Sequence, residues 1–158
     1  MTKTVKIIIM VAICLAVGYG SGIVTKSSIA TWFVTLEKPF FNPPSWVFAP
    51  AWTTLYILMG ISAGIIWSKI EAFPELVKKA LWVFAIQLIL NALWSFLFFG
   101  MQNPLLALIE ILLLWLLIFE TIKVFKPIDN LASKLLIPYI LWVSFATVLN
   151  ASIWWLNK

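Results

Sequence analysis

Apolar residues fall into five long runs along this 158-residue chain, and lysine, proline and polar residues gather in the short segments between them. Each run is about 20 residues long, which suffices for a helix to cross the hydrocarbon core of a bilayer. The runs occupy residues 5–24, 45–68, 80–99, 105–124 and 134–155. Because backbone polar groups in lipid must be hydrogen-bonded internally, the pattern predicts an all-α protein. We expect one domain, residues 1–158, built as an integral membrane bundle of five transmembrane helices.

The longest connection, residues 26–44, is too polar and too rich in proline to cross a membrane. We expect a loop there, with a short helix around residues 29–36 that ends before Pro39. The loop is also rich in aromatic residues, which fits either a lid across one end of the bundle or an anchor in the membrane interface. Ser45, directly after it, is the expected N-cap of the second helix. Residues 100–104 form so short a turn that the third and fourth helices must be antiparallel neighbours.

Composition supports the membrane assignment and narrows the chemistry. Hydrophobic residues make up 63% of the chain and charged residues 11%, too apolar a mixture for a soluble domain of this size. There is no histidine, which excludes a Ser/His pair and a histidine-ligated metal or haem. The single cysteine, Cys14, excludes an intramolecular disulfide. We expect no metal site, no required cofactor and no hydrolase or transferase activity.

All the basic residues behind the net charge of +5 are lysines, and their positions indicate how the protein is oriented in the membrane rather than a nucleic-acid partner. No basic stripe interleaves with exposed aromatic residues, so we expect no nucleic-acid partner. With five spans, eight lysines share the side of the N-terminus: Lys3, Lys6, Lys69, Lys78, Lys79, Lys123, Lys126 and Lys134. The other side holds Lys26, Lys38 and Lys158. This bias predicts a cytoplasmic N-terminus.

Three spans carry aromatic residues on one helical face, with one of the ten tryptophans on each face, and two of these faces also carry amide residues. The faces are Phe48, Trp52 and Tyr56 in the second span; Gln87, Asn91, Trp94, Ser95 and Phe98 in the third; and Trp142, Phe145, Ala146, Leu149 and Asn150 in the fifth. Together they predict an apolar, aromatic pocket for a flat hydrophobic ligand. The face of the third span is equally consistent with contacts between helices.

Two further features allow more than one interpretation. The pairs Gly18/Gly22 and Gly60/Gly64 permit close helix packing, either inside the bundle or in a dimer. In the fourth span, Glu120 can pair with Lys123 three residues later.

Three motifs make the chain resemble the tryptophan-rich sensory protein and translocator protein family (TspO/MBR, the peripheral-type benzodiazepine receptor family). The first lies in the long loop and the second span and consists of Trp32-Phe33, residues 36–39, residues 42–44, Trp52 and residues 55–56. The second lies in the third span and consists of residues 87–88, 91, 94–95 and 98–100. The third lies in the fifth span and consists of residues 138–139, 142, 145–147 and 149–150. The resemblance covers nearly the whole chain. It implies a five-helix bundle, often a homodimer in the lipid bilayer.

The resemblance also implies ligands. These are porphyrins such as protoporphyrin IX and synthetic ligands of the benzodiazepine-receptor class, and some bacterial members are reported to promote light-dependent breakdown of bound porphyrin. The tryptophans linked to that activity match Trp52 and Trp142. Our candidate ligand-binding residues are therefore Phe33, Phe48, Trp52, Asn91, Trp94, Ser95, Trp142, Phe145, Ala146 and Asn150. Without a histidine to ligate iron, we favour free-base porphyrin over haem.

Three functions remain open from the sequence. The first is a membrane tetrapyrrole-binding protein that promotes light-dependent porphyrin degradation or senses the ligand. The second is a transporter of porphyrins or other amphipathic small molecules, and the third is a ligand-regulated membrane scaffold. Lysine-only basicity, and the absence of the sterol-recognition pattern of mammalian members at the C-terminal end, point to a bacterial cell membrane.

Overall fold

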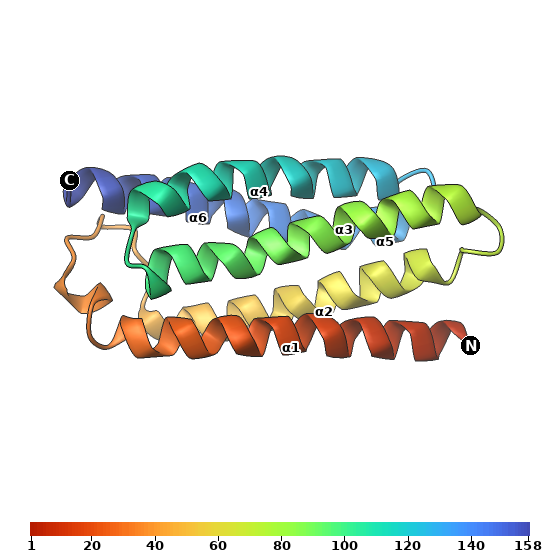
Figure 1. Ribbon diagram of the computed structural model, residues 1–158, viewed down its shortest axis with the longest axis horizontal. Coiled ribbons are helices and arrows are strands. Elements are labelled where there is room, and N and C mark those ends of the chain that lie inside the picture. Colours follow the sequence, from red (N-terminus) through yellow and green to blue (C-terminus); the bar gives the residue numbers. More distant parts are fainter.

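The computed structural model describes residues 1–158 and shows an elongated bundle of long helices with the two termini at opposite ends (Figure 1). The long helices are α1 (Lys3–Ile29), α2 (Phe48–Trp67), α3 (Pro74–Ser95), α4 (Pro104–Phe125) and α6 (Ile137–Leu156). Shorter pieces are α5 (Asn130–Lys134), the 3-10 turns η1 (Phe33–Thr35) and η2 (Ser45–Val47), and the π-helical turn η3 (Phe96–Gly100), which continues α3.

Five helical stretches are long and apolar enough to cross a membrane: Lys3–Ile29, Ser45–Trp67, Pro74–Gly100, Pro104–Phe125 and Asn130–Leu156. The predicted all-α class and the five spans are confirmed, and the protein is a multi-pass integral membrane protein. As the short turn required, α3 and α4 pack against each other.

Helix α1 is longer than the sequence pattern indicated, since it runs through Ile29 instead of ending near residue 24. Two of its polar residues fit in an apolar helix because their hydroxyls find acceptors among carbonyls of the same helix. Thr25 Oγ1 donates to the Ser21 carbonyl oxygen at 3.0 Å, and Ser27 Oγ donates to that of Val24 at 3.0 Å. The short helix expected around residues 29–36 is therefore reduced to the three-residue turn η1.

Other helix ends also differ from the expected ones. Helix α3 begins at Pro74 rather than near residue 80, because proline is well suited to the first helical position, where its missing N–H has no partner to lose. The last span is divided into α5 and α6, and Pro138 lies in the first turn of α6. Ser45 is not an N-cap: it lies inside η2, and α2 begins at Phe48 without a side-chain cap.

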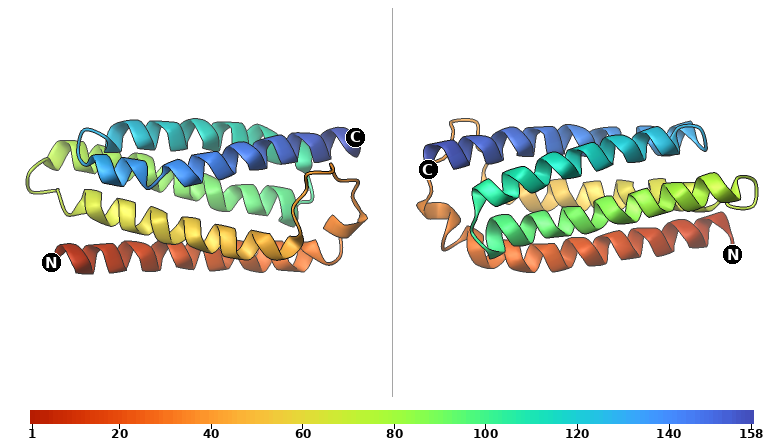
Figure 2. Two further views of the ribbon diagram at one scale, coloured as in Figure 1. Left: turned by 180° about the vertical axis from the view of Figure 1, so that it is seen from behind. Right: turned by 45° about the horizontal axis from the view of Figure 1, so that its top comes forward.

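Helices α1 and α2 lie side by side along the bundle, and both views of Figure 2 show this pairing. Two glycines of α2 make it possible. A Cβ atom on Gly60 would overlap the backbone of Val11, and one on Gly64 would overlap the backbone of Ile7. The Gly60/Gly64 face is thus used inside the bundle, which decides one of the two alternatives left open by the sequence.

The two acidic residues of α4 have different environments. Glu120 Oε2 lies 3.4 Å from Lys123 Nζ near the end of the helix, so the predicted ion pair is confirmed. Glu110 is buried, and neither of its carboxylate oxygens has a hydrogen-bond partner.

Candidate functional site

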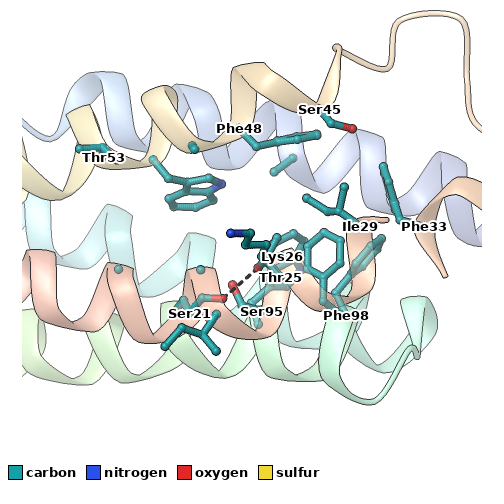
Figure 3. Close-up of a pocket in the computed structure, with 18 of the residues that line it drawn as sticks. Ser21, Thr25, Lys26, Ile29, Phe33, Ser45, Phe48, Thr53, Ser95 and Phe98 are labelled. Atoms are coloured by element: carbon teal, nitrogen blue, oxygen red, sulfur yellow. Dashed lines mark hydrogen bonds between the residues drawn. The ribbon is translucent and has the colours of Figure 1, made fainter. Parts of the chain in front are cut away.

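A cavity of about 1230 Å³ lies at the end of the bundle where residues 30–44 connect α1 to α2. Its walls come from the second half of α1, the first half of α2, the junction of α3 with η3, and α6, and Figure 3 shows residues of α1 and α2 facing each other across it. Helices α4 and α5 contribute no lining residue. Of the 28 lining residues 18 are hydrophobic, so the cavity suits a largely apolar ligand.

Two features of the sequence leave this space open. The close approach of α1 to Gly60 and Gly64 fixes α1 against α2 in the other half of the bundle, where no room for a Cβ atom remains between them. At the inner boundary of the cavity, the Tyr56 ring lies against Gly18, where a Cβ atom would approach its Cδ2 atom to 2.5 Å. Ala146 has a small side chain beside the rings of Trp142 and Phe145, so α6 adds little bulk at that point.

One wall is an aromatic cluster formed by α2 and α6. The ring centroids of Trp52 and Trp142 are 6.4 Å apart, and the two ring planes are perpendicular. Trp142 also lies 6.4 Å from Phe48 and 5.6 Å from Phe145, again between ring centroids. The two tryptophans picked out by the sequence are therefore neighbours in space, although 90 positions separate them along the chain.

The opposite wall combines α3 with the loop. Trp94 stacks on Phe98 with 5.2 Å between ring centroids, and Phe98 lies 6.2 Å from Phe33. Trp94 Nε1 donates to Asn150 Oδ1 at 3.0 Å, and Asn150 Nδ2 donates to the Pro104 carbonyl oxygen at 2.8 Å. These bonds occupy the Asn150 amide and fix the Trp94 ring in place.

Two polar atoms of lining residues are buried without a partner: the indole N–H of Trp142 and the hydroxyl of Ser21. Unpaired buried polar atoms are uncommon in packed interiors, and a native one calls for a specific explanation such as a functional role.

Two phenylalanines of the loop have opposite environments. Phe33 is 3% exposed and lies against Phe99 as well as Phe98, so it closes the cavity at the loop end. Phe40, by contrast, is fully exposed, as expected of an anchor in the membrane interface. Asn157 at the end of α6 holds the loop by two bonds: it accepts from the Glu37 N–H at 2.9 Å and donates to the Glu37 carbonyl oxygen at 2.8 Å.

The structure brings together all but one of the residues proposed as ligand contacts. The cavity walls include Phe33, Phe48, Trp52, Trp94, Ser95, Trp142, Phe145, Ala146 and Asn150. The exception is Asn91, which lies in the core and does not line the cavity.

Asn91 instead belongs to a buried network that joins three helices. Its Oδ1 accepts from the Tyr56 hydroxyl at 2.5 Å, and its Nδ2 donates to the Tyr139 hydroxyl oxygen at 2.8 Å. Tyr139 in turn donates to Gln87 Oε1 at 2.7 Å. For Asn91 and Gln87, contact between helices, which the sequence allowed equally, is the correct interpretation.

Tyr139→Phe is expected to lower the free energy of unfolding by about 1–2 kcal/mol, because it leaves Asn91 Nδ2 and Gln87 Oε1 without partners. Thermal unfolding in detergent, followed by circular dichroism, measures this loss. Tyr19→Phe is the matched control, since Tyr19 is 75% exposed and has no side-chain hydrogen bond. Equal stability of the two variants would show that the network contributes nothing.

Sequence reasoning missed Lys26, which lines the cavity from the last turn of α1. The expected end of the first span at residue 24 had placed it among the headgroups. The spacing of four from Gly18 to Gly22 and on to Lys26, which keeps all three on one helical face, could have revealed it. The hydroxyl-bearing residues Ser21 and Thr53 were missed for a different reason, because isolated serine and threonine residues in an apolar helix carry no distinctive pattern.

Comparison with known proteins finds sequences that match this chain over most of its length. The sequence profile described as the TspO/MBR family matches residues 10–156. The "Tryptophan-rich protein TspO" of Chlorobaculum tepidum is 44% identical over 151 residues, which cover 93% of this chain and 92% of that protein. The protein of the same name from Archaeoglobus fulgidus is 43% identical, with coverage of 96% and 97%. The human "Translocator protein" is 36% identical over 123 residues, 78% of this chain and 73% of that protein.

Proposed function

We propose that this chain, which belongs to the TspO/MBR family, binds a tetrapyrrole such as free-base protoporphyrin IX in the aromatic cavity at one end of its bundle. The observation that carries the proposal is the cavity itself: tryptophan and phenylalanine rings form two of its walls, and its lining is mostly apolar.

The cavity is compatible with a ligand of this size and shape. Pockets for drug-sized ligands have volumes of about 300–1,000 Å³. At about 1230 Å³ the present cavity is larger, which leaves room for a flat macrocycle with side groups. The chain has no histidine to ligate iron, so a metal-free porphyrin is the better match. Synthetic ligands of the benzodiazepine-receptor class, which are flat and apolar, would compete for the same walls.

The output that we propose is light-dependent degradation of the bound porphyrin, or sensing of the ligand. An excited porphyrin can sensitise dioxygen or exchange an electron with a nearby indole, and Trp52 and Trp142 supply two indoles at the cavity wall. Neither process needs a general base. The cavity offers no nucleophile paired with a base, so its residues do not support hydrolysis or group transfer.

We further propose a homodimer in a bacterial cell membrane with the N-terminus in the cytoplasm. The lysine bias supports the orientation, because eight lysines lie at the N-terminal end of the bundle against three at the loop end. Since Gly60 and Gly64 are occupied by α1 of the same chain, a dimer has to use another face.

The test is a titration of the purified protein in dodecyl maltoside with protoporphyrin IX in the dark, followed by tryptophan quenching and porphyrin absorbance. We expect saturable binding with one porphyrin per chain, and displacement by a synthetic benzodiazepine-receptor ligand. A quenching signal that rises without saturation would mean that the porphyrin partitions into the micelle, and it would overturn the proposed function.

A further inference from the structure

Lys26 is the one charged side chain among the residues that line the cavity. It lies in the last turn of α1, yet Figure 3 shows its side chain reaching from α1 toward the middle of the cavity, in the direction of the helix that carries Phe48 and Thr53. The Lys26 side chain is exposed, so its ammonium group is accessible to an anionic group of a ligand that enters the cavity.

No group of the protein pairs with the Lys26 ammonium group. No carboxylate lies within 4 Å of the Lys26 ammonium group, and the group makes no hydrogen bond. The other two lysines at this end of the bundle are engaged. Lys38 Nζ donates to the Leu36 carbonyl oxygen at 3.0 Å and lies over the Phe33 ring, and Lys158 Nζ lies 3.5 Å from the Trp155 ring centroid.

A purely structural role does not account for where the Lys26 side chain lies. A lysine in the last helical turn interacts favourably with the helix dipole, and near a membrane surface it usually extends toward the headgroups. Both effects would be satisfied with the side chain outside the cavity. Figure 3 places it inside, on the same side as Ser21, Thr25 and Ser95.

We propose that Lys26 binds a carboxylate of the cavity's ligand. This deepens the proposed function and rests on it. It defines the ligand class as an amphipathic molecule, with a planar apolar body against the tryptophan and phenylalanine walls and an anionic group that reaches α1. A charge-assisted hydrogen bond is stronger than a neutral one, so the anionic group contributes to affinity as well as orientation.

The experiment compares protoporphyrin IX, which has two carboxylates, with its uncharged dimethyl ester. Wild type, Lys26→Met, Lys26→Arg and Lys158→Met are titrated in dodecyl maltoside in the dark. Methionine keeps the unbranched apolar stem and removes the charge, and arginine restores the charge. Lys158→Met removes a charge at the same end of the bundle outside the cavity.

Wild type should bind the acid about tenfold or more tightly than the ester, the factor that corresponds to one charge-assisted contact. Lys26→Met should bind both porphyrins with the affinity of the ester, while Lys26→Arg and Lys158→Met should keep the preference for the acid. Ester binding by Lys26→Met also reports that the variant is folded. If it binds neither porphyrin, Lys26→Gln replaces it.

Three results would overturn the inference. One is equal binding of acid and ester by wild type, and a second is a preference for the acid that survives in Lys26→Met. A third is loss of the wild-type preference when phosphatidylglycerol is added, which would assign Lys26 to a lipid phosphate. In all three the proposed porphyrin function stands, whereas failure of wild type to bind either porphyrin would overturn that function as well.

Discussion

Trp52→Phe or Trp142→Phe is expected to reduce the light-dependent loss of bound protoporphyrin IX at least about tenfold, while binding in the dark weakens by no more than about tenfold. Phenylalanine retains an aromatic ring at the cavity wall, so most of the apolar contact survives. It lacks the electron-rich indole, which is the group that an excited porphyrin can oxidise.

The geometry explains why substitution of either tryptophan alone should slow the light-dependent loss of porphyrin. The two rings are perpendicular, with centroids 6.4 Å apart, so a porphyrin near one indole is near the other. Trp52 also lies 5.8 Å from Tyr56, and Trp142 from α6 contacts Phe48 and Phe145. Each indole is held by aromatic neighbours, and the loss of one alters the pair.

The measurement is the decay of porphyrin absorbance under constant illumination in air, at saturating porphyrin as established in the dark. Trp82→Phe is the matched control, because Trp82 is 72% exposed on the outside of α3 and does not line the cavity. Decay at the wild-type rate in both cavity variants would show that the two tryptophans take no part in the photochemistry. Equal loss in all three variants would point to a general effect of tryptophan content.

Gly60→Ala is expected to lower the free energy of unfolding by about 3 kcal/mol, the upper part of the range for overpacking a core. The added Cβ atom would lie 2.7 Å from the Val11 backbone nitrogen and would overlap the Val11 Cα atom. A backbone cannot move aside as a side chain can, so α1 must shift away from α2. Since this contact fixes α1 at one end of the cavity, porphyrin binding should weaken in parallel.

Thermal unfolding in detergent tests this directly, with Gly20→Ala as the control. Gly20 also lies in a long membrane helix, but a Cβ atom there would meet nothing within 4 Å. Alanine in a helix interior is favoured over glycine by about 1 kcal/mol, so the control should be as stable as wild type or slightly more stable. Two variants of equal stability would show that the contact between α1 and α2 tolerates a methyl group.

The fold was largely predictable because each span is a long apolar run, and lipid leaves the backbone few alternatives to a helix. The ends of the spans were less predictable. Residues 25–28 are polar in composition yet helical. Thr25 and Ser27 donate to carbonyls one turn earlier, and Ser28 donates to the Phe99 carbonyl oxygen. Composition records polarity and does not show that these hydroxyls already have hydrogen-bond partners.

The cavity was predictable to the extent that aromatic residues share helical faces. Trp52, Trp94 and Trp142 all proved to line it. Asn91 lies on the same face of α3 as Trp94, but one turn deeper, and periodicity does not specify how deep a face remains open. Only the positions of Tyr56 and Tyr139 show that Asn91 is enclosed by hydrogen bonds.

The most direct test of the central claim is to fill the cavity and measure porphyrin binding. Ala146→Phe adds a ring at the cavity wall, and Val148→Phe adds a ring two residues later on α6, where the side chain is 56% exposed outside the cavity. We predict that Ala146→Phe weakens dark binding of protoporphyrin IX at least about tenfold and that Val148→Phe leaves it unchanged. Unchanged binding by Ala146→Phe, with the variant as stable as wild type, would contradict the account and place the porphyrin elsewhere on the protein.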